Sequence, residues 1–80
     1  MPTVLRLNGF RFFFFSNEGN EPPHIHVERG ECYAKYWLGH VELAKSVGFR
    51  SPELTKLHKM VIKHVDLFEE KWHEHFGSTN

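Results

Sequence analysis

The sequence predicts an α+β fold, in which an antiparallel sheet of two β-hairpins, with four to five strands, carries one long C-terminal helix on one face. Two observations support this class. Up to about residue 50, short β-branched or aromatic runs alternate with turn sequences, whereas residues 51–77 repeat apolar side chains at helical steps. The 80 residues are therefore expected to form a single domain, residues 1–80, with 1–50 mainly β and 51–77 helical.

The first hairpin is predicted by Asn8-Gly9, which separates residues 4–7 from residues 10–15. Both turn residues tolerate positive φ, as a two-residue hairpin turn requires. On the helix-covered face, this turn pairs Leu7 with Phe10, Leu5 with Phe12 and Thr3 with Phe14. The opposite face then holds Val4, Arg6, Arg11, Phe13 and Phe15, with the two arginines directly across from each other.

A second hairpin is expected after the turn-forming stretch 16–23, SNEGNEPP. A turn at Arg29-Gly30 would join HIHVE to ECYAKYWL and place two pairs on the core face, Ile25 with Ala34 and Val27 with Cys32. The other face would add Trp37 and pair His24 with Lys35, His26 with Tyr33 and Glu28 with Glu31. Residues 41–47 fit either a fifth strand or a short helix.

The helix is expected to begin at Ser51, a favourable N-cap, with Pro52 at the first helical position and Glu53 in the first turn. It should end near Phe76, because Gly77 is a favourable helix stop. One apolar stripe facing the sheet is formed by Leu54, Leu57, Val61, Val65 (or His64), Phe68, Trp72 and Phe76.

Charge and cysteine content narrow the class of protein. Ten Lys and Arg balance ten Asp and Glu, which argues mildly against nonspecific binding to nucleic acid. The one cysteine, Cys32, can form neither an internal disulfide nor a multi-thiolate metal site. The N-terminus lacks a signal-peptide pattern, and no apolar segment has the length of a membrane span. We therefore expect a cytoplasmic protein with no membrane association.

The face away from the helix is the predicted binding surface. If both hairpins lie in one sheet, this face gathers Arg6, Arg11, Phe13, His24, His26, Tyr33, Lys35 and Trp37. Large exposed apolar patches usually mark an interaction site, and aromatic residues with arginine are common anchors between proteins. The leading interpretation is a protein-protein surface, either a homodimer face or a docking site for another small chain. Carboxylates of that partner, or of this chain, would then offset the repulsion between the paired arginines.

A metal site is the first alternative for this face. His24 and His26 lie on one side of the predicted strand, as zinc ligands can, but a site needs at least a third protein ligand. No local spacing forces the other possible ligands close, namely Glu28, His73 and His75. We therefore expect no metal and no cofactor.

Catalysis and RNA binding are the remaining alternatives. A metal-independent ribonuclease needs an acid-base group, here His24 or His26, and cations beside the phosphate, here Arg6, Arg11 or Lys35. The same face could instead bind single-stranded RNA by stacking its aromatic side chains on bases. The residue types suit both functions, but the sequence does not fix the distances between them.

Several segments of the sequence resemble the domain-of-unknown-function 4160 family: MPTVLRLNGFRFFFFSNE, PPHIHVERGE, AKYWL, VELAKSVGF and the W-x-x-x-F-G of WHEHFG. The matched positions are Arg6, Gly9, Arg11, Phe12, Phe13, Pro23, His24, His26, Ala34, Trp72 and Phe76, whereas the loop at 18–21 is longer than the usual form. The resemblance implies a small, mainly bacterial protein without an established activity or catalytic set. It also implies a partner, because such proteins are often encoded beside a second small domain, of unknown function 2442, as in a toxin-antitoxin-like pair.

Overall fold

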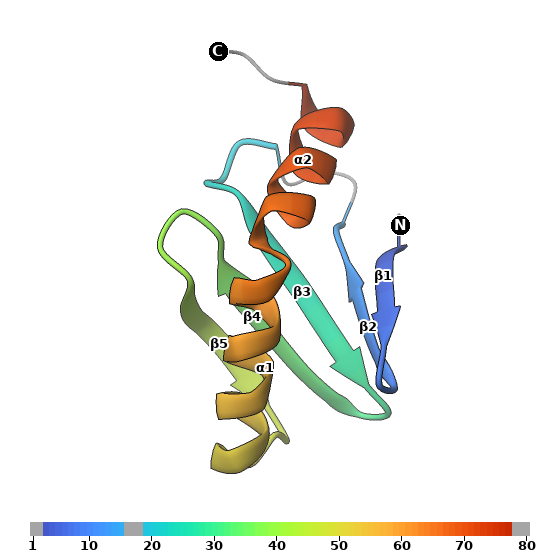
Figure 1. Ribbon diagram of the computed structural model, residues 1–80, viewed down its shortest axis with the longest axis vertical. Helices are drawn as coiled ribbons and strands as arrows, with labels where there is room; N and C mark the ends of the chain where they lie inside the picture. Colours follow the sequence, from blue (N-terminus) through green and yellow to red (C-terminus); the bar gives the residue numbers. More distant parts are fainter. Residues whose placement is uncertain (1–2, 16–18, 78–80) are drawn as a thin grey trace.

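The computed structural model describes residues 3–15 and 19–77, and it has five strands and two helices in that part of the chain. The elements are β1 (Thr3–Leu7), β2 (Phe10–Phe13), β3 (His24–Arg29), β4 (Cys32–Trp37), β5 (Glu42–Val47), α1 (Ser51–Lys63) and α2 (Val65–Phe76). The strands form one antiparallel sheet in the order β1-β2-β3-β4-β5, and both helices lie on the same side of it (Figure 1). The α+β class is therefore confirmed, and residues 41–47 supply the fifth strand.

The expectation of one long helix is wrong, because the helical region is interrupted at His64, which has φ −111° and ψ 15°. The His64 N–H is shared between the carbonyls of Met60 and Val61, at 3.1 and 3.2 Å. Neither proline nor glycine marks the break. Because the strands of a sheet twist, two shorter helices can follow the sheet surface, and each buries its own apolar residues against it.

The helix ends otherwise lie close to their expected positions. Arg50 rather than Ser51 is the N-cap, so the helix begins at Ser51, one residue earlier than the expected cap implied. Glu53 Oε1 accepts a hydrogen bond from the Arg50 backbone N–H at 3.0 Å, which satisfies one of the free donors at a helix start. At the other end, α2 stops at Phe76 and Gly77 follows with φ 81°, as the sequence predicted.

The register of the first hairpin is confirmed near its turn and wrong at its open end. Leu7 pairs with Phe10, Leu5 with Phe12 and Arg6 with Arg11. Thr3, however, lies opposite Phe13 rather than Phe14, because the pairing is irregular between Thr3 and Leu5. The extra residue, Val4, packs against the core instead of standing on the opposite face. An irregularity of this kind adds one residue to one strand and has no marker in the alternation.

The second hairpin turns at Gly30-Glu31 rather than at Arg29-Gly30, so every pair is shifted by two residues. The observed partners are His24 with Trp37, Ile25 with Tyr36, His26 with Lys35, Val27 with Ala34 and Glu28 with Tyr33. Gly30 has φ 60°, the left-handed conformation that glycine adopts without strain. A shift of two residues preserves the face of every side chain, since alternation along a strand has a period of two.

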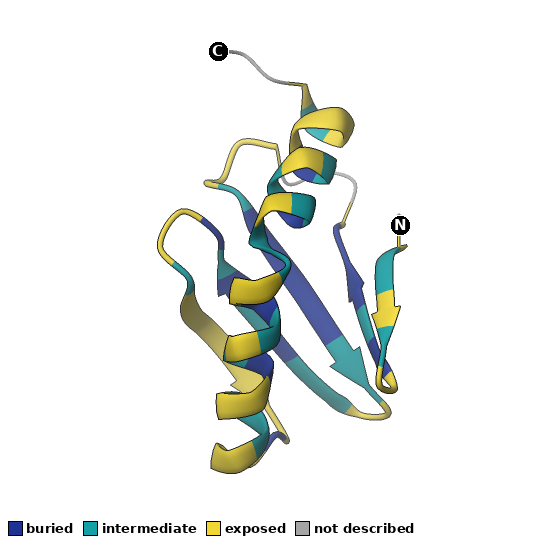
Figure 2. Ribbon diagram, viewed as in Figure 1, coloured by how far each residue is buried: buried dark blue, intermediate teal, exposed yellow. Residues whose placement is uncertain are grey.

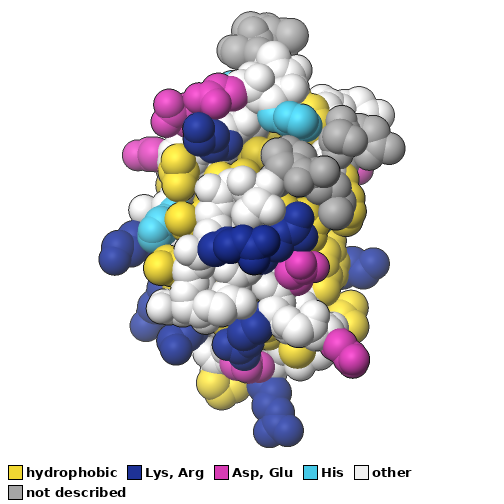
Figure 3. Space-filling model, turned by 90° about the vertical axis from the view of Figure 1, so that its right-hand side faces the viewer, with side chains coloured by type: hydrophobic (Ala, Val, Ile, Leu, Met, Phe, Trp, Pro, Cys, Tyr) yellow, Lys and Arg dark blue, Asp and Glu magenta, His cyan; other side chains and the backbone are white. Residues whose placement is uncertain are grey.

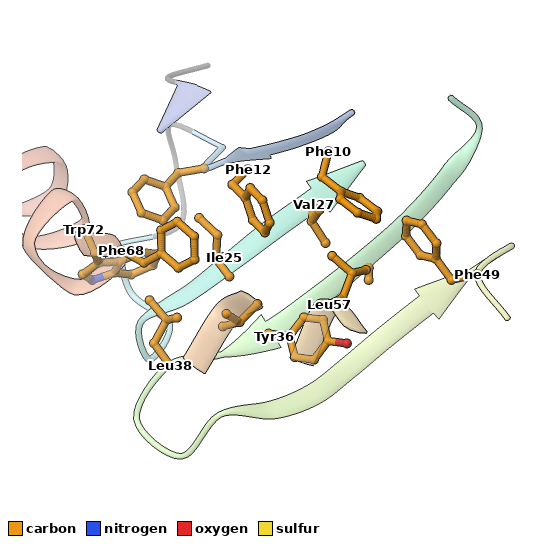
Figure 4. Packing of buried hydrophobic residues seen from close by; sticks show 13 residues of the cluster. Phe10, Phe12, Ile25, Val27, Tyr36, Leu38, Phe49, Leu57, Phe68 and Trp72 are labelled. Carbon is orange, nitrogen blue, oxygen red and sulfur yellow. The ribbon is translucent and has the colours of Figure 1, made fainter. Parts of the chain in front are cut away.

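The core lies between the sheet and the two helices (Figure 4). From the strands it takes Phe10, Phe12, Ile25, Val27, Ala34 and Tyr36, from the segments next to them Phe14, Leu38 and Phe49, and from the helices Leu57, Val61, Phe68 and Trp72. Phe12 stacks on Phe68 with 5.2 Å between ring centroids. Burial raises the pKa of Tyr36, and its hydroxyl donates to the Leu54 carbonyl at 3.1 Å. The predicted apolar stripe of the helical region is therefore the surface that meets the sheet.

Glu53 joins the start of α1 to the end of β3, because its carboxylate also pairs with Arg29. The hydrogen bond from the Arg50 backbone lowers the pKa of Glu53 below its ordinary value of 4.5, and the charge of Arg29 adds to this. A lowered pKa in the folded state stabilises the fold above the ordinary value, and that contribution is lost as pH falls through the lower, folded-state pKa.

Glu53→Gln is therefore expected to lower the free energy of unfolding at neutral pH, with the difference from the unmodified protein shrinking on acidification below 4.5. Urea unfolding at a series of pH values measures this. Glu31→Gln is the matched control, since Glu31 is exposed in the turn between β3 and β4 and should show a smaller difference. A Glu53→Gln difference that stays constant down to strongly acidic pH would contradict the assignment.

Candidate functional site

The eight residues of the predicted binding surface do share one face of the sheet, on the side away from the helices. Their exposure differs from the expectation, however. Phe13 is 2% exposed, His24 0% and His26 2%, and Figure 2 shows the middle of the sheet as buried. Arg6 is exposed, while Arg11, Tyr33, Lys35 and Trp37 are half-buried. For Phe13 and the two histidines, the prediction of an open surface is wrong.

Aromatic packing on this face explains the burial. The His26 ring stacks on Phe13 and Tyr33, with ring centroids 5.4 and 5.7 Å away. Phe15 covers the pair, since its ring meets His26 edge-on at 4.6 Å and Phe13 at 5.3 Å. These four residues, Phe13, Phe15, His26 and Tyr33, form what we call the second core. The aromatic character that suggested an interaction site is therefore largely satisfied within the chain.

His24 connects the second core to the main one. Its ring centroid lies 5.0 Å from that of His26, 5.6 Å from Trp37 and 4.8 Å from Trp72 of α2. The Nδ1 atom lies 2.9 Å from the Pro22 carbonyl oxygen. A carbonyl can only accept, so Nδ1 carries the proton and the tautomer is fixed. His26 Nδ1 is in turn 2.6 Å from the Tyr33 hydroxyl.

Arg11 and Lys35, two of the cations of this face, pair with carboxylates of the same chain. Arg11 Nη1 lies 2.9 Å from Glu28 Oε2, and Arg11 Nε donates to Thr3 Oγ1 at 2.8 Å. The guanidinium also lies 4.4 Å from the Phe13 ring centroid, a favourable cation–π distance. Glu28 therefore offsets the repulsion of the cross-strand pair that Arg11 forms with Arg6.

Lys35 has a similar arrangement further along the sheet. Its Nζ lies 3.0 Å from Glu21 Oε1 and 4.5 Å from the Trp37 ring centroid. Glu21 precedes β3 by three residues, and this ion pair places its carboxylate beside Lys35 on the same face. The four catalytic candidates, His24, His26, Arg11 and Lys35, are thus brought to one face, but with both imidazoles buried and both cations engaged.

No metal centre can be built from the part of the chain that the structure describes, since no three His, Cys, Asp or Glu residues there converge. A general base must reach a substrate proton, and stacking on RNA needs an accessible ring. Neither imidazole is accessible here. The geometry therefore gives no support to the ribonuclease interpretation or to a stacking platform at these histidines. Figure 3 views the β1 side of the molecule, where basic and acidic side chains are interspersed.

The exposed edge of the sheet is a feature that sequence reasoning missed. Every residue of β5 is exposed, including Leu43 at 39% and Val47 at 52%, and Figure 2 shows the strand in yellow. Beside it lies a hollow of about 340 Å³ between β5 and α1, lined by Tyr36, Leu43, Ser51, Leu54, Thr55, His58 and Lys59. The sequence did not predict this site, because residues 41–47 fitted either a strand or a short helix. Whether a strand lies at the edge of the sheet is in any case decided by the tertiary structure.

The fold and the site together define a small α+β protein, an antiparallel meander with two helices on one face and a second core on the other. The chain belongs to the family described as Domain of unknown function (DUF4160), whose sequence model matches residues 9–73. The resemblance noted from the sequence is therefore confirmed. No curated protein and no solved structure matches the chain. Of the helices in the described residues, none is long and apolar enough to cross a membrane.

Proposed function

We propose that this protein is a small interaction module, one member of a toxin-antitoxin-like pair, that binds a second small protein along the outer edge of β5. The observation that carries the proposal is the exposure of β5 along its whole length. An edge strand presents a row of backbone donors and acceptors to an incoming chain, and addition of a strand to such an edge is a common mode of protein recognition.

The two edges of the sheet differ in a way that favours β5. On β1, the three apolar residues Val4, Leu5 and Leu7 are half-buried and pack against the core. On β5, Leu43 and Val47 remain exposed, and Leu43 lines the hollow beside α1. A partner strand at β5 would gain backbone hydrogen bonds and could place alternate side chains in that hollow.

Charge around the hollow defines the chemistry of the partner. Lys59 and His58 are among its lining residues, and none of the lining residues is acidic. Lys45 is exposed in the middle of β5. Complementary potentials steer association and exclude wrong partners. The expected occupant is therefore an extended segment with apolar side chains and carboxylates, from a second small protein. The resemblance suggests a domain-of-unknown-function 2442 type of partner.

Leu43→Arg is expected to weaken binding of the proposed partner, a protein of the domain-of-unknown-function 2442 type, by at least about tenfold, because it places a bulky cation in the apolar contact. Isothermal titration calorimetry with the purified pair measures this. Asn20→Arg is the control, because it adds the same charge at an exposed position before β3 that does not line the hollow. Its affinity should stay near that of the unmodified protein.

The outcomes separate the possible surfaces. The absence of any heat or co-elution with the unmodified protein at micromolar concentration would end the partner proposal. Equal losses for Leu43→Arg and Asn20→Arg would move the contact away from β5. Arg6→Glu provides a further comparison, since Arg6 is exposed on β1. A loss confined to Arg6→Glu would return the binding site to the face originally predicted from the sequence.

A further inference from the structure

The outward surfaces of the two helices carry opposite charge. On α1, the exposed charged residues are Lys56, Lys59 and Lys63. On α2 they are Asp66, Glu70 and Glu74. The minority charges are engaged locally, because Glu53 pairs with Arg29 and Lys71 Nζ lies 3.4 Å from Glu74 Oε1. One continuous surface is therefore positive at one end and negative at the other.

Helix geometry places the central residues of both charged sets directly outward. Leu57 and Val61 are buried against the sheet, and Lys59 lies midway between them, about 200° around the helix from each. Glu70 has the same relation to the buried Phe68 and Trp72 of α2. The two helices follow each other nearly end to end along the 36 Å length of the molecule (Figure 1).

The helix dipole explains only part of this distribution. Carboxylates are favoured near a helix N-terminus and cations near its C-terminus, which suits Asp66 and Lys63. Glu74, however, lies near the C-terminus of α2 and Lys56 in the first half of α1. Among the described residues, no ion pair engages Lys56, Lys59, Lys63, Asp66 or Glu70. The charges of the outward surface are thus largely available to another molecule.

We infer that this surface binds a second copy of the same chain, with the helices antiparallel across a two-fold axis near His64. In that arrangement Lys59 faces Glu70 of the second copy, and Lys56 faces its Glu74. The midpoint of both pairs falls at residues 64–65, so a single two-fold axis satisfies them together and repeats each pair twice. Ile62, which is 50% exposed, lies beside the axis and supplies an apolar centre.

The pairing of Lys59 with Glu70 can be tested by exchanging the charges. Within one chain the two residues are eleven positions apart, about 16 Å along a helix, so they do not contact each other. Lys59→Glu or Glu70→Lys alone creates two like-charge pairs per dimer and should raise the dimer dissociation constant at least about tenfold. The double variant restores opposite charges, and its dissociation constant should return to within about threefold of the original.

Sedimentation equilibrium over a range of protein concentrations measures these constants, and raising the salt concentration should weaken the dimer. Lys45→Glu is the control, because it makes the same change of charge at an exposed position paired with Lys35, on the face of the sheet away from the helices, and should leave dimerisation unchanged. The three positions changed in the test and the control, Lys45, Lys59 and Glu70, are all exposed, so circular dichroism should report an unaltered fold.

A protein that stays monomeric at every concentration would overturn the inference. A dimer that tolerates Lys59→Glu, or a double variant as weak as the single ones, would also overturn it. The result is separable from the proposed β5 contact. Leu43→Arg should weaken the partner complex and leave the dimer intact, whereas Glu70→Lys, at a position that does not line the hollow beside β5, should weaken the dimer and leave the partner complex intact.

Discussion

Phe13→Ala is expected to lower the free energy of unfolding by about 3 kcal/mol, within the range for phenylalanine truncation in a packed core. The reason is that Phe13 is 2% exposed although it lies on the face away from the helices. Its ring contacts the rings of His26 and Phe15, at 5.4 and 5.3 Å between centroids. The Arg11 guanidinium lies 4.4 Å from the centroid of the Phe13 ring. Urea unfolding monitored by circular dichroism measures the loss.

The control for this prediction is Phe15→Ala. Phe15 belongs to the second core but is 36% exposed. Its truncation should therefore lower the free energy of unfolding by only about 1 kcal/mol. A loss for Phe13→Ala no larger than that for Phe15→Ala would mean that the second core is open in solution. In that case the face would again qualify as an aromatic interaction surface.

Trp72→Ala is expected to cost about 4 kcal/mol, the largest effect among these variants. Trp72 is 4% exposed, and its ring contacts Phe76, His24 and Phe14 at centroid distances of 4.2, 4.8 and 5.3 Å. It is therefore the side chain that ties α2 to the sheet and to His24. A domain of 80 residues has only about 4–12 kcal/mol of total stability, so this variant should be close to unfolding.

Hydrogen exchange distinguishes the expected mechanism from general weakening. Amides of α2 should exchange fastest in Trp72→Ala, because the helix loses its main anchor. Leu67→Ala is the control on the same helix, since Leu67 is only partly buried against the core, and its cost should be smaller. Equal protection of α1 and α2 in Trp72→Ala would count against a local role for this tryptophan.

Strand alternation predicted the candidate site only in part. It placed His24, His26 and Lys35 on one face, and that assignment survived a wrong turn in the second hairpin because the register error was two residues. It could not say whether the face is covered. Coverage comes from Phe15 and from Glu21, which lie outside the paired strands. The β5 edge was likewise not predicted, because exposure depends on which strand ends the sheet.

The sequence by itself determined the local features of this protein: the turn at Asn8-Gly9, the faces of the strands, the apolar stripe of the helical region and its stop at Gly77. These follow from short-range preferences of turn residues and from periodicity. Only the tertiary structure decided the break at His64, the irregularity at Val4 and the burial of both histidines. Each of these depends on packing between segments distant in the chain, which no local pattern encodes.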